Sequence, residues 1–232
     1  MGTHVLDASE KISEAVTKIY LFSGMGADSR LFKNIGPFEG YEIVPLPYIH
    51  PKKSQTLREY AELLVAHYSF EEPYFLGGVS QGGMIAQELA QLLKPKGLVL
   101  ISTATLRSEM PLLFDWVRRL GLSAVWSKSV LEPVASMADR FTIKSPEGRK
   151  LFMEMLRDSD PDFMRFGAKA ILEWSPPQVD VPVIRIHGTV DRVFPFSKVR
   201  NAIPIKGGNH FMIFERAQEI TDILEKSLDA LD

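Results

Sequence analysis

The sequence predicts an α/β protein with a mostly parallel sheet of about six strands and helices on both faces. Two observations lead to this fold class. The runs that resemble strands are short and apolar almost throughout, as in a parallel sheet covered on both faces. They also alternate with segments of helical spacing, which is the order expected when helices connect parallel strands. The chain has 232 residues, 45% of them hydrophobic, which is enough to build the core of one such domain.

Strands are predicted where short apolar runs are bounded by glycine, proline or polar residues. These runs are residues 19–23, 41–46, 73–79, 97–102, 181–188 and 202–208. Helices are predicted where apolar residues recur every three to four positions. These segments are residues 56–68, 80–93 and 213–231. In an open parallel sheet, ligands bind at the carboxyl ends of the strands, so functional residues are expected directly after a strand.

Residues 104–178 interrupt the alternation of strand and helix. The segment has no clear strand, and it holds all three tryptophans and five of the nine methionines. These residues are Trp116, Trp126, Trp174, Met110, Met137, Met153, Met155 and Met164. Asp160 followed by Pro161 is typical of a helix start, with the aspartate as N-cap. We expect a helical insertion whose apolar side chains mostly form its own core, with the remainder lining a pocket.

The interruption divides the chain into three predicted parts. Residues 17–103 and 179–232 form the α/β core. Residues 104–178 form a helical cap that folds over the carboxyl edge of the sheet. Residues 1–16 are rich in polar side chains and form an N-terminal extension.

A serine flanked by glycines follows the third predicted strand. Residues 78–82, GVSQG, fit the pattern G-x-S-x-G, in which a strained turn between strand and helix holds the serine clear of the sheet. The glycines avoid clashes in this turn, and the helix start offers N–H groups to a developing anion. The alternative is a tight turn with a helix-capping serine. The strand before Ser80 and the helix after it favour a nucleophile.

A serine nucleophile needs a base to take its proton and an acid to orient that base. Asp191 stands in the loop after the fifth predicted strand, and His210 stands in the loop after the sixth. Both loops leave the same edge of the sheet as Ser80. Serine, acid and histidine also follow one another in the chain order found with this type of turn. Ser80, Asp191 and His210 are therefore the predicted catalytic residues.

An oxyanion hole needs two N–H donors. One is predicted to be the backbone amide of Gln81, directly after the nucleophile. The other is predicted to be the amide of Met25 in the loop SGMGAD, whose flanking glycines let the backbone approach a substrate. Contacts with substrate are predicted for His50, Trp116 and Phe211.

The motifs SGMG, GVSQGG, GTVDRVFP and GGNHF follow one another along the chain. In this order and context they resemble the α/β-hydrolase fold superfamily, in its cap-bearing branch, over roughly residues 17–230. The resemblance implies that fold with a serine nucleophile and no cofactor. The chain differs from the family in two ways. Ser23 stands where members commonly carry histidine in the oxyanion loop, and the usual first strands are missing.

The resemblance implies a serine hydrolase that cleaves a carboxylic ester, or a related acyl bond, of a small or medium apolar substrate through an acyl-enzyme. A serine nucleophile argues against the dehalogenase and epoxide-hydrolase branches, which use aspartate. A perhydrolase, a lyase or a C–C bond hydrolase of the same superfamily would use the same residues and stays an alternative. A receptor-like protein that binds a ligand without catalysis is a further alternative.

Composition argues against other classes of function. The net charge of -2, with no basic stripe, disfavours nucleic-acid binding. The absence of cysteine excludes disulfides, cysteine-based zinc sites and a thiol nucleophile. The chain shows neither the apolar segment of a signal peptide nor a run long enough to span a membrane. We expect a cytoplasmic monomer or homodimer that acts on a small molecule, with no metal, organic cofactor, membrane or nucleic-acid partner.

Three other features fit a functional role less well. The loop GMGADS has Ser29 where a dinucleotide fingerprint requires glycine or alanine. Glu109 follows the fourth strand, where some members of the superfamily carry their acid, but Asp191 is the better candidate. His187 ends a buried strand, and we interpret it as a structural histidine.

Overall fold

Six parallel strands form one sheet in the order β2-β1-β3-β4-β5-β6. The computed structural model describes residues 16–52, 54–120 and 143–231. The strands are β1 (Thr17–Phe22), β2 (Tyr41–Pro45), β3 (Tyr74–Val79), β4 (Gly97–Ile101), β5 (Val183–Gly188) and β6 (Ile203–Ile205). Each strand overlaps the apolar run that predicted it. The predicted fold class, an α/β protein with about six parallel strands, is confirmed.

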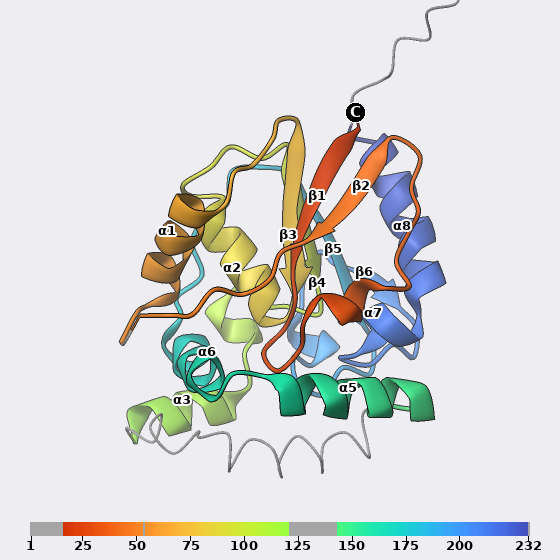
Figure 1. Ribbon diagram of the computed structural model, residues 1–232. Coiled ribbons are helices and arrows are strands. Elements are labelled where there is room, and N and C mark those ends of the chain that lie inside the picture. The colour runs from red at the N-terminus through yellow and green to blue at the C-terminus, as the bar shows by residue number, and fades with distance from the viewer. Residues whose placement is uncertain (1–15, 53, 121–142, 232) are drawn as a thin grey trace, which may run out of the picture.

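Helices cover both faces of the sheet (Figure 1). The helices of the described residues are α1 (Leu57–His67), α2 (Gln81–Leu89), α3 (Leu112–Arg119), α5 (Pro146–Asp158), α6 (Pro161–Glu173), α7 (Met212–Glu215) and α8 (Ala217–Asp229). Helices α1 and α2 pack on one face, and α7 and α8 pack on the other. The single helix predicted over 213–231 is two helices, because the backbone of Arg216 (φ -124°, ψ 32°) departs from helical values between them.

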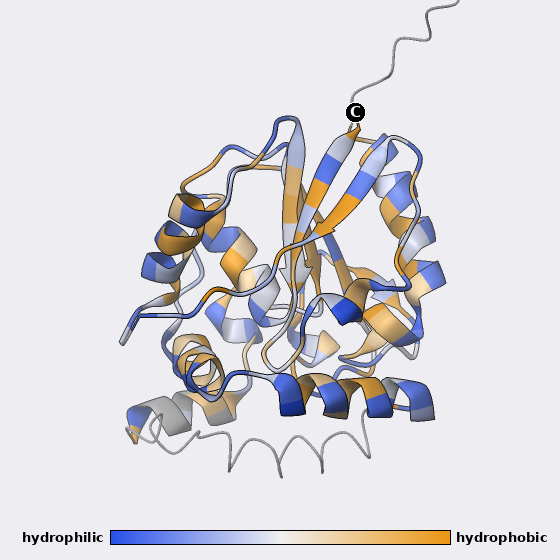
Figure 2. Cartoon of the chain, in the orientation of Figure 1, coloured by the Kyte–Doolittle hydropathy of each residue, from blue (hydrophilic) through white to orange (hydrophobic). Residues whose placement is uncertain are grey.

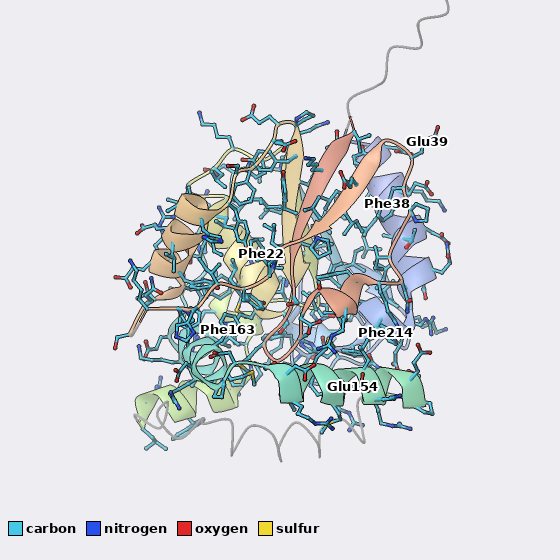
Figure 3. All side chains as sticks on the ribbon, in the orientation of Figure 1. Phe22, Phe38, Glu39, Glu154, Phe163 and Phe214 are labelled. Atoms are coloured by element: carbon cyan, nitrogen blue, oxygen red, sulfur yellow. The ribbon has the colours of Figure 1, made fainter. Side chains whose placement is uncertain are left out.

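Side chains of the central strands alternate between two apolar cores. Leu21 of β1 packs with the core under α7 and α8, whereas Phe22 packs with the core under α1 and α2. Phe22 and Phe214, labelled in Figure 3, belong to these opposite cores. Figure 2 shows apolar residues along the strands and on the helices beside them. Because both faces are covered, the strands are apolar almost throughout, as the sequence indicated.

Helices α3, α5 and α6 lie across the carboxyl ends of the strands (Figure 1). Asp160 caps α6 as predicted, because its Oδ1 accepts a hydrogen bond from the Phe163 N–H at 2.8 Å. At the other end of α6, Trp174 donates from Nε1 to Oε1 of Glu88 on α2 at 2.7 Å. Both side chains are buried. This bond ties the C-terminal end of α6 to the C-terminal end of α2.

Some sequence predictions fall outside the described residues. Trp126 and Met137 of the predicted cap are among them, as is most of the predicted N-terminal extension. The boundaries between core, cap and extension stay predictions. In the three described ranges, every helix is too short or too polar to cross a lipid bilayer.

A buried ion pair joins β5 to the segment after β4. The guanidinium of Arg185 donates to both carboxylate oxygens of Glu109, at 2.9 and 2.6 Å, and both side chains are at most 5% exposed. The backbone N–H of Thr105 adds a bond of 2.7 Å to the same carboxylate. Burial opposes ionisation of Glu109, but the bonds and charge of Arg185 outweigh burial and hold its pKa below the ordinary value. Glu109 is therefore a structural partner of Arg185, and its alternative role as the acid of the triad is wrong.

Glu109→Ala should lower the free energy of unfolding by about 3–5 kcal/mol, because it leaves the Arg185 charge buried without its partner. Denaturant unfolding at neutral pH measures the loss. Glu219→Ala is the matched control, since Glu219 forms an exposed pair with Arg216 on the surface. The control should change stability by no more than about 0.5 kcal/mol. Equal, small losses in the two variants would contradict the importance of the buried pair.

Candidate active site

Ser80 occupies a strained turn between β3 and α2. Its backbone has φ 55° and ψ -118°, a positive φ that side-chain-bearing residues rarely adopt. Its N–H donates to the carbonyl of Ile101 on β4 at 3.0 Å, so the turn is fixed to the neighbouring strand. A backbone of this kind costs on the order of 1–3 kcal/mol and persists only where the surroundings enforce it.

Gly78 and Gly82 of the motif allow the backbone segments around this turn to pack in direct contact. A Cβ added to Gly78 would lie 2.4 Å from the carbonyl carbon of Gly82. A Cβ added to Gly82 would lie 2.0 Å from the carbonyl oxygen of Phe22 on β1. No side chain fits at either distance. The two glycines are therefore required because α2 begins directly against the end of β1.

The carbonyl of Ser80 is bound by the segment that follows β4, and β5 supports that segment in turn. The hydroxyl of Thr103 donates to this carbonyl at 2.6 Å. Arg185 in turn donates to the Thr103 carbonyl at 2.9 Å, which connects the turn to the buried pair with Glu109. The sequence did not reveal this support, because its members come from three separate segments.

Asp191 and His210 meet as predicted. Asp191 Oδ2 lies 2.8 Å from His210 Nδ1, with the carboxylate fully buried and the imidazole 21% exposed. The other oxygen, Oδ1, accepts the N–H groups of Val193 at 2.8 Å and Phe194 at 3.0 Å. Burial of Asp191 opposes ionisation, but the charge and hydrogen bond of His210 and the Phe194 N–H outweigh it and lower the pKa of Asp191. The carboxylate is therefore charged and aimed at the imidazole.

Ser80 lies on the same sheet edge as this pair. Ser80 follows β3 and Asp191 follows β5, and β4 lies between these two strands. Ile101 at the end of β4 lies opposite Val79 of β3 and opposite Ile186 of β5. Among the described residues, the Ser80 hydroxyl has no hydrogen-bond partner. The assignment of Ser80 as the nucleophile activated by His210 stays a prediction.

The predicted oxyanion donors flank Ser80. A Cβ added to Gly24 would lie 3.3 Å from the Ser80 Cβ, so the loop after β1 passes directly beside the serine. Ser23, which stands in place of the family's histidine, anchors this loop by donating from its hydroxyl to the Ala27 carbonyl at 2.9 Å. The backbone N–H groups of Met25 and Gln81 have no acceptor within the described part of the chain.

The Gln81 side chain connects the turn to α6. It is fully buried, and neither its Nε2 nor its Oε1 has a hydrogen-bond partner in the described structure. A Cβ added to Gly167 of α6 would lie 2.8 Å from both of these atoms. The absence of a side chain at Gly167 therefore lets α6 rest on the residue that follows Ser80.

The three predicted substrate contacts have different surroundings. His50 lines a cavity of about 370 Å³ together with Ser23 and Phe163, the latter labelled in Figure 3. Trp116 lies on α3 and is 62% exposed. Phe211 is 7% exposed and packs edge-on against Phe152 of α5, with ring centroids 5.7 Å apart. Phe211 therefore contributes to the core, which its position beside His210 could not reveal.

Sequence reasoning missed Phe194, which contacts both members of the acid–base pair. Its N–H binds Asp191, and its ring lies 5.6 Å from the His210 ring between centroids. Its place in the motif GTVDRVFP, three residues after the acid, was a signal that could have found it. His187 is fully buried, as expected of a structural histidine.

Within the described residues, no group of histidine, aspartate and glutamate side chains is arranged to hold a metal ion.

Solved structures share this architecture at low sequence identity. An esterase from Thermogutta terrifontis is 18% identical, with a TM-score of 0.71 over 93% of this chain and 90% of its own. An enol-lactonase from Burkholderia xenovorans is 16% identical, with a TM-score of 0.72 over 92% of each chain. A bromoperoxidase from Bacillus anthracis is 16% identical, with a TM-score of 0.65 over 92% of each chain. No protein-family model and no curated protein matches the sequence. The chain has the α/β-hydrolase fold, as its motifs indicated.

Gly167→Ala should change stability with opposite sign in two backgrounds. In the native chain the new methyl meets the buried Gln81 amide, and the free energy of unfolding should fall by about 1 kcal/mol or more. In a Gln81→Ala background the obstacle is gone, and the higher helix propensity of alanine should raise stability by up to about 1 kcal/mol. Denaturant unfolding of the four chains measures the coupling. An equal effect in both backgrounds would contradict the contact between α6 and Gln81.

Proposed function

We propose that the protein is a serine hydrolase that cleaves carboxylic esters through an acyl-enzyme. The observation that carries the proposal is the bonded pair of Asp191 and His210 on the sheet edge where Ser80 occupies its strained turn. A strained nucleophile position and a buried, ionised carboxylate both have an energetic cost. Their occurrence at one edge is expected of a catalytic site and not of a simple fold support.

In the proposed reaction, the Ser80 hydroxyl attacks the ester carbonyl while His210 takes its proton at Nε2. Asp191 keeps the other nitrogen, Nδ1, protonated and stabilises the imidazolium that forms. The N–H groups of Met25 and Gln81 receive the oxyanion of the tetrahedral intermediate. His210 then returns the proton to the leaving alcohol. In the second half, water attacks the acyl-enzyme with His210 as base and releases the acid.

The proposed substrate is a small or medium ester with an apolar acyl group. The helices at the carboxyl edge supply apolar side chains near the turn, since Leu156 and Met164 both approach Gly26 in the loop after β1. Two of the solved structures of this fold are named as esterase and enol-lactonase, which supports hydrolysis of an ester-type bond.

Other functions compete with ester hydrolysis. The bromoperoxidase among the similar structures favours a perhydrolase as the second candidate on the same residues. Lyase or C–C bond hydrolase chemistry would also use this site. Product analysis separates these reactions. A non-catalytic binding protein would have no need for a reactive serine.

Hydrolysis of p-nitrophenyl esters with short and medium acyl chains tests the proposal. Ser80→Ala, His210→Ala and Asp191→Asn should each lower kcat by about 1,000-fold or more, because the three residues act as a unit. His67→Ala and Asp222→Asn are matched controls on the exposed surface of α1 and α8, and they should leave kcat unchanged.

Turnover that survives in Ser80→Ala, or triad variants that behave like the controls, would contradict the mechanism. A folded native chain that turns over no ester, yet binds one of these compounds, would favour the non-catalytic alternative.

A further inference from the structure

His187 lies at the end of β5 beneath the acid–base pair. Its side chain is fully buried, and its Nε2 lies 2.8 Å from the carbonyl oxygen of Phe194. The same nitrogen lies 3.4 Å from Oδ2 of Asp191, the oxygen that binds His210. The other ring nitrogen, Nδ1, is buried without a hydrogen-bond partner in the described structure. The proposed reaction gives this histidine no part.

The carbonyl of Phe194 determines which nitrogen of His187 carries the proton. A carbonyl oxygen can only accept a hydrogen bond, so the proton must reside on Nε2. Nδ1 is then bare if the ring is neutral. Burial favours the neutral ring and lowers the pKa of His187, against the opposing influence of Asp191. At neutral pH the side chain is therefore an uncharged donor with its N–H aimed at the loop after Asp191.

Phe194 connects this donor to the catalytic pair. Its carbonyl accepts from His187, its N–H donates to Asp191 Oδ1 at 3.0 Å, and its ring packs against His210. One residue thus contacts all three ionisable groups. If the Phe194 peptide shifted, the carboxylate and the imidazole would lose their mutual alignment together.

We propose that His187 is a positioning residue of the reaction, whose Nε2–H fixes the loop 191–194 so that the Asp191 carboxylate faces His210. The inference rests on the proposed function, because only there does the Asp191–His210 pair activate Ser80. Outer hydrogen bonds that orient a reactive histidine commonly contribute 10- to 100-fold to activity in metal sites, and a similar factor is expected here.

The neutral state of His187 is part of the same arrangement. The charged and titratable groups that act on it are Asp191, His210 and Arg185. A protonated His187 would present a cation to Asp191 Oδ2 and would compete with His210 for that oxygen. Burial of the ring and the nearby Arg185 both disfavour this cation.

Two substitutions separate the N–H donor from the packing of the ring. His187→Gln places an amide N–H as many bonds from Cβ as Nε2 is, whereas His187→Leu removes the donor. The measured quantity is the second-order rate at which a fluorophosphonate labels Ser80, followed against pH by intact-protein mass. Circular dichroism and unfolding curves establish that each variant is folded.

His187→Gln should keep the labelling rate close to that of the native chain, because its amide N–H can replace the imidazole N–H as donor. His187→Leu should lose about 10- to 100-fold on the plateau. The acid limb of its rate–pH curve should also move to lower pH, because a displaced Asp191 stabilises the His210 imidazolium less. A loss of stability alone would not shift the acid limb of the rate–pH curve. It would also leave the ratio between the labelling rates of the two variants unchanged. A folded His187→Leu with native rates, or equal losses in both variants, would overturn the positioning role alone.

Nitrogen NMR of the native chain tests the proposal without any variant. The ring of His187 should show a protonated Nε2 and a bare Nδ1, and it should be uncharged at neutral pH. A proton on Nδ1, or a charged ring at neutral pH, would overturn the assignment. A native chain that takes no label would overturn the proposed function, and the positioning role would fall with it.

Discussion

The close approach of the α2 start to the end of β1 is the constraint on which the rest of the site depends. Gly78 and Gly82 leave no room for a side chain, so the backbone of the turn rests on the carbonyl of Phe22. This contact forces Ser80 into a positive φ and sets it beside Gly24 of the neighbouring loop. The same geometry that strains the turn therefore brings the serine close to the loop that carries Met25, one of the two predicted oxyanion donors.

Strand β5 provides polar support for both halves of the candidate site. Arg185 and His187 are two residues apart and point to the same face of the sheet. Arg185 reaches the Ser80 turn through Thr103, and His187 reaches the acid–base pair through Phe194. A buried polar group without a hydrogen-bond partner costs free energy. The hydrogen bonds of these groups therefore hold them in one fixed arrangement. One strand thus supports both the Ser80 turn and the loop that holds Asp191.

The sequence predicted the fold, the turn at Ser80 and the meeting of Asp191 with His210, because each leaves a local signal in apolar runs, glycine spacing and position after a strand. It could not pair Arg185 with Glu109, since 76 residues separate them and only the sheet order brings them together. Nor could it reveal that Phe211 turns into the core. The direction of that side chain depends on how α7 docks against α5, which no local pattern encodes.

The central claim is that Ser80, His210 and the oxyanion donors form one reactive assembly. Intact-protein mass after brief exposure to a fluorophosphonate tests it most directly, with Ser80→Ala as the comparison. We predict a single adduct on the native chain and none on the variant. Only an activated serine is phosphonylated during such a brief exposure. A folded native chain without an adduct, or an adduct that persists in Ser80→Ala, would contradict the account.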